Sequence, residues 1–345
     1  MKNFAIIGVG GYIAPRHLKA IKETGNRLVA ALDVNDSVGI LDRFFSDVPF
    51  FTEFERFDRH IEKLRRQGGE DKVDYVTVCS PNYLHDAHIR FALRIGANAI
   101  CEKPLVLNPW NLDALQEMEN ESGRTVNTIL QLRVHPALIA LRESLLRESL
   151  LSESLIVNSE LKNRAPQSIN HDPLNQKHEV TLTYITSRGP WYLSSWKGNH
   201  EKSGGVATNV GIHFFDLLIW LFGPVQDNAV HYSDALKTGG YIELERARVK
   251  WFLSIDRNDL PESATECGLS TFRSITVDGK EVEFSEGFTD LHTVVYQRTL
   301  EGIGFGLEDA RPAIALAHDI RHAKSNGISP DSHPFLQKNQ EVKNG

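Results

Sequence analysis

Three polar side chains stand where a substrate hydroxyl could lose its proton. Lys103 follows a short apolar run in AICEKP, and a lysine at such a strand end could hydrogen-bond a hydroxyl and help remove its proton. Asn209 and His213 lie four residues apart in GGVATNVGIHFFD, a spacing that places two side chains on one helical face. We therefore predict Lys103 and His213 as catalytic residues that also contact the substrate, with Asn209 as a further substrate contact.

The amide of Asn209 affects which of Lys103 and His213 takes the proton from the substrate hydroxyl. An amide cannot stabilise an imidazolium on His213 as a carboxylate would. The sequence therefore predicts that Lys103 carries most of the proton transfer. The alternative interpretation, a core histidine with a helix-capping asparagine, stays open.

A glycine turn after the first strand predicts a dinucleotide site. In IIGVGGYIAPRH, Gly8 permits the tight turn and Gly10 lets the backbone approach a pyrophosphate, while Ile13 takes the place of the third glycine in GxGxxG. Asp33 ends the second strand, where a carboxylate accepts ribose hydroxyls and repels a 2′-phosphate, which favours NAD over NADP. The predicted cofactor contacts are Gly8, Gly10, Tyr12, Ile13, Asp33, Ser80, Pro81, Asn82, His85, Glu102, Lys103 and Gln131.

Two of these residues have a structural alternative, because Asn82 could cap a helix and His85 could belong to the first helical turn.

For an anionic substrate, the best cations are Arg188 in TSRGPWY and Lys197 in SWKG, since such groups bind phosphate or carboxylate oxygens. Tyr192 and Arg133 complete the predicted substrate contacts. His171, His178 and His200 lack the spacing of metal ligands, so we expect no metal site.

In the first third of the chain, alternating strands and helices must position the predicted cofactor contacts. We expect residues 1–125 to form an NAD-binding Rossmann domain with a doubly wound parallel sheet, in an α/β protein. The predicted strands are 4–8, 27–33, 75–79, 98–102 and 125–130, and the predicted helices are 15–24, 53–67, 84–95 and 110–122.

After the first domain, strands and helices no longer alternate regularly. Residues 126–328 predict an α+β domain for substrate binding and oligomerisation. Its sheet should be open and mostly antiparallel, with a hairpin turn at Asp278-Gly279. The polar segment 151–179 is expected to form a surface excursion, and residues 329–345 a flexible tail. The predicted strands are 180–185, 229–231, 247–255, 273–277 and 281–284, and the predicted helices are 136–148, 291–300 and 307–324.

The net charge, the cysteines and the first residues indicate which partners and which cellular location to expect. The 345 residues carry a net charge of −7, which argues against nucleic acid or an anionic membrane as the main partner. The three cysteines show no CxxC spacing, as expected in a reducing compartment. The sequence enters its first strand at once, so we expect no signal peptide and a cytoplasmic location.

Several motifs together resemble a known family. GVGG, the acid at position 33, CSPNYLH, CEKP, QLRVHP and GG-x3-N-x-G-x-H-x2-D occur in the order seen in the glucose–fructose oxidoreductase, inositol dehydrogenase and rhizopine-catabolism family. The resemblance spans nearly the whole chain. It implies an NAD(P)-dependent dehydrogenase with an N-terminal Rossmann domain and a C-terminal open sheet. Many relatives carry an acid where this chain has Asn209.

Longer stretches, among them YIAPRHLKAIK, LTYITSRGPWY and EFSEGFTDLHTVVY, resemble the UDP-N-acetylglucosaminuronate dehydrogenases. This resemblance implies oxidation of the 3″-hydroxyl of a UDP-sugar uronate to a ketone, within nucleotide-sugar biosynthesis for bacterial surface polysaccharide (O-antigen). It also implies a homotetramer. Some members hold NADH tightly and recycle it with 2-oxoglutarate. The segment 151–179 looks longer than the usual connection in that subfamily.

Two alternatives stay open at this point. Within the enzyme class, the chain could oxidise another sugar or a cyclitol. In a different class, it could be a catalytically silent regulator that senses NAD. Such a regulator could lose Lys103 and His213 without penalty, whereas this chain keeps both.

Overall fold

The computed structural model describes the backbone of residues 1–160, 177–284 and 290–338, and the side chains of these residues except 149–160. The chain forms two compact units. The first contains residues 1–131, 189–216 and 288–322, and the second contains 132–188, 217–287 and 323–345. The units therefore interleave along the chain, whereas we expected one boundary near residue 125.

A six-stranded parallel sheet organises the first unit, in the order β3-β2-β1-β4-β5-β6. This is the strand order of a Rossmann fold, and the predicted doubly wound sheet is confirmed. Strands β1 and β4 are buried along their whole length, as a sheet with both faces covered requires. The strands are β1 Asn3–Ile7, β2 Arg27–Leu32, β3 Phe50–Phe51, β4 Tyr75–Val78, β5 Asn98–Cys101 and β6 Val126–Thr128.

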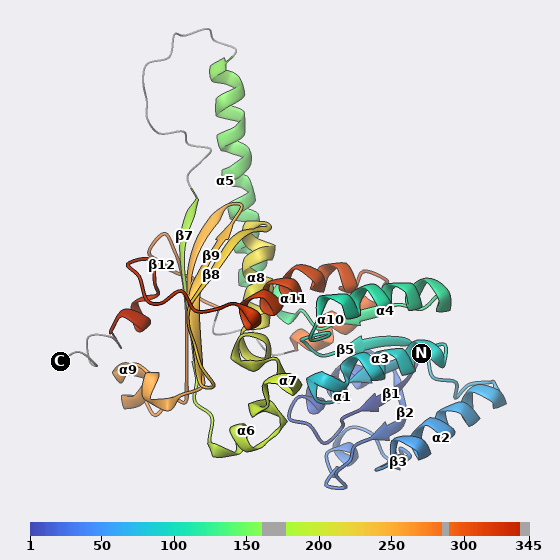
Figure 1. The fold of residues 1–345 in the computed structure, drawn as a ribbon. Coiled ribbons are helices and arrows are strands. Elements are labelled where there is room, and N and C mark those ends of the chain that lie inside the picture. The colour runs from blue at the N-terminus through green and yellow to red at the C-terminus, as the bar shows by residue number, and fades with distance from the viewer. Residues whose placement is uncertain (161–176, 285–289, 339–345) are drawn as a thin grey trace. The chain divides into compact units, whose positions relative to one another are not determined.

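The crossover helices lie close to their predicted places: α1 Ala14–Glu23, α2 Phe54–Gln67, α3 His85–Arg94 and α4 Pro109–Ser122. Two later helices also belong to this unit, α10 Leu291–Leu300 and α11 Leu307–His322. Helix α10 packs on α1, and α11 packs on α4 (Figure 1). We had expected both in the second domain, so this part of the chain returns to the nucleotide-binding unit.

Short helices lead into a long apolar one. Helices α6 Pro190–Ser194 and α7 His200–Ser203 precede a π-helical turn, Ala207–Gly211, and then α8 Ile212–Phe222. The stretch His200–Phe222 is long and apolar enough to cross a membrane, yet 72% of its apolar window is buried inside the protein. Burial of this kind is typical of a core helix in a soluble fold.

The second unit is built on a six-stranded sheet in the order β12-β11-β7-β10-β9-β8. Neighbouring strands are antiparallel except β7 and β10, which are parallel. The predicted open, mostly antiparallel sheet is thus confirmed, with its hairpin between β11 and β12. The strands are β7 His178–Thr186, β8 Val225–Ser233, β9 Lys237–Leu244, β10 Ala247–Ser254, β11 Thr271–Val277 and β12 Lys280–Glu281.

Strand β9 was not predicted, because its sequence KTGGYIEL contains two glycines that suggest a loop. Gly240 pairs with Trp251 across the sheet. A Cβ on Gly240 would lie 2.1 Å from the carbonyl oxygen of Ala229. Glycine within a strand often marks such a close backbone approach, so these glycines serve the sheet.

Two further expectations on the second unit were wrong. Helix α5, Pro136–Glu160, continues twelve residues past the predicted end at 148, because its Leu, Glu and Arg residues favour a helix. The rest of the expected excursion falls largely on residues 161–176, outside the described part. The start of the expected flexible tail is packed, since Ser332, His333 and Leu336 are buried. The remaining short helices are α9 Glu262–Glu266 and the 3₁₀ turns Leu41–Arg43, Asn82–Leu84, Gln131–Val134, Trp196–Gly198 and Arg257–Asp259.

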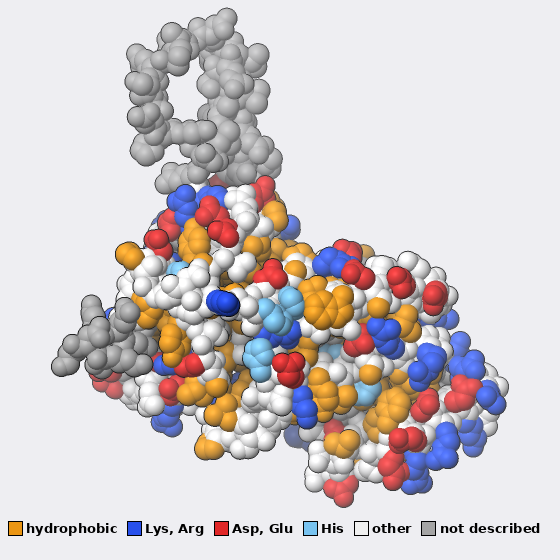
Figure 2. Space-filling model, viewed as in Figure 1, with side chains coloured by type: hydrophobic (Ala, Val, Ile, Leu, Met, Phe, Trp, Pro, Cys, Tyr) orange, Lys and Arg blue, Asp and Glu red, His pale blue; other side chains and the backbone are white. Residues whose placement is uncertain are grey.

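Charged side chains of both signs are mixed over the face seen in Figure 2, with basic ones gathering over α2. Glu62 lies within this basic group and pairs with Arg65 at 2.7 Å and Arg66 at 2.6 Å. These two arginines lower the pKa of Glu62 to about 2. The basic group is thus partly neutralised by its own acid, in a chain whose net charge is negative.

Candidate active site

The glycine turn and Asp33 form one connected feature. Gly8 has a φ of +89°, and a Cβ there would lie 2.6 Å from the backbone of Cys79, so only glycine fits. The Gly10 amide donates to Asp33 Oδ2 at 2.8 Å, and the Asn35 amide donates to Asp33 Oδ1 at 2.9 Å. The carboxylate is therefore held at the end of β2, beside the turn that the sequence predicts as a pyrophosphate site.

The loop after β4 is held by its polar side chains. Asn82 Nδ2 donates to the carbonyl oxygen of Ser203 at 3.1 Å and to Asn209 Oδ1 at 3.2 Å. The capping alternative is wrong, because Pro81 is the N-cap residue of the 3₁₀ turn and Leu84 is that of α3. Ser80 Oγ lies 2.8 Å from His88 Nδ1. His85 is buried, and both of its ring nitrogens contact backbone carbonyls, so a structural role fits this residue.

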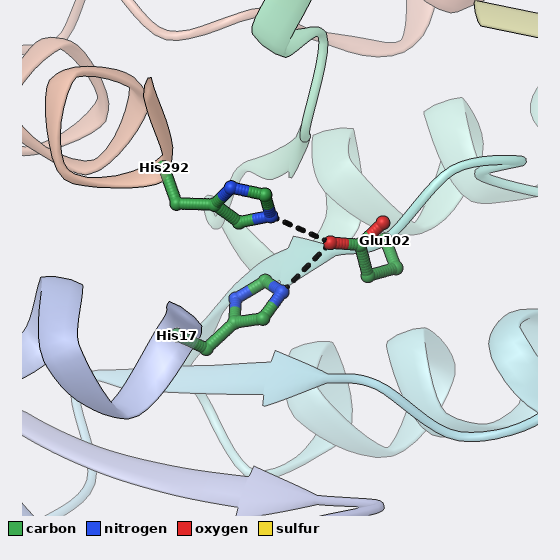
Figure 3. A group of neighbouring side chains, drawn as sticks. All are labelled: His17, Glu102 and His292. Atoms are coloured by element: carbon green, nitrogen blue, oxygen red, sulfur yellow. Dashed lines mark hydrogen bonds and ion pairs between the residues drawn. The ribbon is translucent and has the colours of Figure 1, made fainter. Parts of the chain in front are cut away.

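Glu102 is the centre of a buried polar cluster (Figure 3). Its Oε1 accepts from His17 Nε2 at 2.8 Å and from His292 Nε2 at 3.0 Å. His17 extends the network, because its Nδ1 lies 2.8 Å from the hydroxyl of Tyr296. Burial raises the pKa of Glu102, but the hydrogen bonds from both histidines outweigh it and hold the pKa well below its usual value.

The same trio resembles a metal site in composition, since its ligand atoms lie within 4.8 Å of one another. Both imidazoles, however, bond directly to the carboxylate. Burial lowers the pKa of His17, against the raising effect of Glu102. These hydrogen bonds tie α1 and α10 to the residue that precedes Lys103.

Lys103 follows Glu102 at the end of β5. Its backbone amide donates to Glu102 Oε2 at 3.2 Å, and its Nζ donates to the carbonyl oxygen of Asn209 at 3.4 Å. The side chain of Asn209 bonds Asn82 and donates through Nδ2 to the hydroxyl of Tyr192 at 2.6 Å. Asn209 is thus a link between the loop after β4 and Tyr192, with its carbonyl oxygen on the lysine.

His213 and Lys103 line one small cavity of about 10 Å³. That volume is near the lower limit for holding a single water. Thr128 and Asp216 also line this cavity. Asn209 lies in the π-helical turn Ala207–Gly211, and His213 lies in the helix that follows. A π-helical turn is a local irregularity that frequently marks functional sites.

The remaining predicted residues are distributed over both units. Lys197 Nζ lies 5.1 Å from the ring centres of both Trp191 and Trp196, within the range of cation–π attraction. Tyr12 is 90% exposed, Ile13 is the N-cap residue of α1, and Pro81 precedes the 3₁₀ turn at Asn82. Arg133 and exposed Arg188 belong to the second unit.

Several residues of this site were not predicted from the sequence. The cluster around Glu102 was missed because its other members, His17, Tyr296 and His292, come from helices far apart in the chain. No local spacing predicts such a cluster. Asp216 lies one helical turn after His213, so spacing could have suggested it. Gln131 has a buried side-chain oxygen with no hydrogen-bond partner among the described residues, which fits a residue that bonds a cofactor.

Fold and site together define a nucleotide-dependent oxidoreductase. The model of the oxidoreductase family with an NAD-binding Rossmann fold matches residues 2–129, and the model of its C-terminal alpha/beta domain matches residues 168–251. The chain belongs to this family, the glucose–fructose oxidoreductase, inositol dehydrogenase and rhizopine-catabolism (GFO/IDH/MocA) oxidoreductases. The resemblance seen in the sequence is confirmed.

Solved structures extend this result. The WlbA (WbpB) dehydrogenase from Thermus thermophilus, in complex with NAD and UDP-GlcNAcA, is 50% identical, with 97% of this chain and 100% of that chain covered and a TM-score of 0.86. The same dehydrogenase with NAD and alpha-ketoglutarate gives 51% identity, the same coverage and a TM-score of 0.85. The WlbA dehydrogenase from Bordetella pertussis shares the fold at 18% identity, with 95% and 96% covered and a TM-score of 0.70.

Curated relatives are more distant. The 1,5-anhydro-D-fructose reductase of Ensifer adhaerens is 22% identical over 69% of this chain and 62% of its own length. The matches to three other curated relatives cover 36%, 38% and 49% of those proteins. Against these relatives the chain thus spans about a third to a half of their length.

Proposed function

We propose that this protein oxidises the 3″-hydroxyl of UDP-N-acetylglucosaminuronate to the 3-keto sugar with NAD⁺. The observation that carries the proposal is the 50% identity, over 97% of the chain, to a dehydrogenase whose structure holds NAD and UDP-GlcNAcA. We place the reaction in bacterial surface-polysaccharide (O-antigen) biosynthesis and in a homotetramer, as the sequence resemblance implies, and we propose a cytoplasmic location.

The residues present fit a bound NAD. Gly8 leaves no room for a side chain, Asp33 is fixed beside the turn, and Gln131 has a buried oxygen with no partner among the described residues. We therefore assign these residues, with the loop after β4, to the cofactor. NAD⁺ when bound supplies the hydride acceptor.

On the protein side, Lys103 hydrogen-bonds the reacting hydroxyl and removes its proton. The Asn209 carbonyl and the Glu102 carboxylate restrain its ammonium and its backbone amide. His213, on the same small cavity, assists at the same hydroxyl. We keep Arg133, Arg188, Tyr192, Lys197 and Asn209 as proposed substrate contacts. Two other possibilities, an enzyme for a neutral sugar or cyclitol and an NAD-sensing regulator, make different predictions below.

The direct test incubates the purified protein with NAD⁺ and either UDP-GlcNAcA, UDP-GlcNAc, free glucose or inositol. We expect mass spectrometry to show loss of two hydrogens from UDP-GlcNAcA only. Equal turnover of a free sugar or inositol would support the neutral-substrate alternative. Cofactor binding without oxidation of any substrate would support the regulator.

A second proposal concerns the fate of the reduced cofactor. The Thermus thermophilus relative was also crystallised with NAD and alpha-ketoglutarate. We propose that 2-oxoglutarate accepts the hydride at its keto carbon and a proton at its keto oxygen, and leaves as 2-hydroxyglutarate. This step regenerates NAD⁺. Catalytic amounts of NAD⁺ should then support complete conversion when 2-oxoglutarate is added. Turnover that stops at one equivalent of cofactor would exclude this recycling.

Replacing Asp33 should weaken NAD binding. Loss of a carboxylate that accepts ribose hydroxyls costs roughly 1.5–3 kcal/mol, or about 10- to 100-fold in affinity. We expect Asp33→Ala to show that loss in a fluorescence titration. Asp33→Asn keeps an oxygen for the Gly10 amide and should lose NAD affinity while gaining NADP affinity relative to NAD. Equal NAD and NADP affinity in the native protein would contradict the assignment.

Replacing Lys197 should affect substrate binding more than turnover. If its ammonium contacts the diphosphate or the uronate, Lys197→Met should raise KM about 10-fold or more, with kcat nearly unchanged. Lys202→Met is a matched control, because Lys202 Nζ lies 5.2 Å from the ring of Tyr83 in a similar ammonium–ring contact. Equal changes of KM in both variants would remove Lys197 from the substrate site.

A further inference from the structure

The imidazole of His85 joins the carboxyl ends of two neighbouring strands. Its Nδ1 lies 2.7 Å from the carbonyl oxygen of Pro104, and its Nε2 lies 2.8 Å from the carbonyl oxygen of Ser80. Ser80 belongs to the loop after β4, and Pro104 directly follows Lys103 after β5. The residue is 1% exposed, so both contacts are shielded from bulk water.

The two ring nitrogens of His85 cannot both donate a hydrogen bond while the ring is neutral. Carbonyl oxygens only accept hydrogen bonds, and an imidazole carries two N–H donors only when it is protonated. Burial lowers the pKa of His85, the two carbonyls and Glu102 oppose this effect, and Lys103 reinforces it. His88, on the same helix, is a further titratable neighbour. The neutral ring still donates to one carbonyl, and the protonated ring donates to both.

The turn that carries Lys103 is thus held at two points. Glu102 accepts the Lys103 amide on one side, and His85 contacts the Pro104 carbonyl on the other. Only the second contact also reaches the loop assigned to the cofactor, through Ser80. A change in the turn would move the lysine ammonium, and a displacement of about 1 Å in a reacting group can cost on the order of 100-fold in rate.

We propose that His85 is a positioning residue, which sets the Lys103 side chain relative to the cofactor loop by bridging the carbonyls of Ser80 and Pro104. The proposal rests on the dehydrogenase function proposed above. It assigns His85 no contact with substrate. The distinction from a cofactor contact is that the ring nitrogens are engaged with backbone on both sides.

The test is a double-mutant cycle that combines His85→Leu with Lys103→Met. Leucine fills similar space without a donor. Alone, His85→Leu should lower kcat about 10- to 100-fold, with KM for UDP-GlcNAcA nearly unchanged. In the Lys103→Met background it should cost less than about threefold, because there is no ammonium left to position. His85→Gln, which restores one donor, should recover part of the activity.

His88→Gln is the matched control, since His88 also bonds Ser80, but through the side-chain oxygen and with no contact to Pro104. We expect it to leave kcat within about threefold of the native value. An equal loss from His85→Leu in both lysine backgrounds, or no loss at all, would overturn the proposal. If His85→Leu does not fold, His85→Gln enters the cycle in its place with the same criterion.

NAD⁺ affinity separates this proposal from the proposed function. Fluorescence titration needs no sugar, and His85→Leu should weaken NAD⁺ binding severalfold while His88→Gln does not. A native protein that fails to oxidise UDP-GlcNAcA, yet shows this difference, would contradict the proposed substrate and leave the bridge supported. Unchanged NAD⁺ affinity in His85→Leu would contradict the bridge to the cofactor loop.

Discussion

Lys103→Met is expected to lower turnover on the order of 10³-fold, within the range that general bases contribute. In the proposed reaction the neutral amine of Lys103 takes the hydroxyl proton, and methionine keeps the length of the side chain without a basic atom. The measurement is kcat at saturating NAD⁺ and UDP-GlcNAcA, with NAD⁺ affinity titrated separately.

His213→Asn is the comparison variant for this experiment. Both residues line the same cavity, but Asn209 bonds Asn82 and Tyr192 and offers His213 no carboxylate. We therefore expect His213→Asn to lose less than Lys103→Met. An inactive His213→Asn beside an active Lys103→Met would reverse the assignment of the base.

Glu102→Gln is expected to destabilise the fold by roughly 1.5–3 kcal/mol, the usual worth of a hydrogen bond to a charged group. The glutamine keeps the shape of the side chain but removes the charge that holds His17 and His292. Urea unfolding at neutral pH measures the loss. Glu62→Gln is the matched control, because Glu62 also has a lowered pKa but lies at the surface, and its loss should be much smaller.

The sign of the pH dependence follows from the lowered pKa of Glu102. Its contribution to stability is present above the ordinary glutamate pKa and is lost as the pH falls through the lowered value. The lowered pKa of His17 acts in the same direction, since the unfolded state then binds the proton more readily. The difference between native protein and Glu102→Gln should shrink in acid. A difference that grows in acid would contradict an ionised Glu102.

Local pattern was sufficient for the parts of the site that lie at strand ends. The glycine turn, Asp33 and Lys103 each follow a buried strand, and a parallel sheet brings such ends to one edge. The spacing of Asn209 and His213 predicted one common helical face; the structure places Asn209 in the π-helical turn and His213 on the cavity that Lys103 also lines. The hydrogen bonds of Asn209 to Asn82 and Tyr192 could not be predicted, because they join separate segments of the chain.

Long-range packing explains the other differences. His292 reaches Glu102 across 190 positions of sequence, so only the fold reveals that α10 contacts the residue that precedes Lys103. Strand β9 was hidden by Gly239 and Gly240, whose small size is needed by the neighbouring strand and by Trp251. Helix α5 runs through serines and an asparagine that suggest a loop, because the residues between them favour a helix.

Transfer of deuterium from the sugar tests the central claim most directly. The native protein is incubated with NAD⁺ and UDP-GlcNAcA that carries deuterium at C3″, and both products are analysed by mass spectrometry and NMR. We predict a keto sugar without deuterium and one deuterium in the reduced cofactor, or in 2-hydroxyglutarate when 2-oxoglutarate is present. An oxidised sugar that retains its deuterium, or no oxidation of this substrate, would contradict the account.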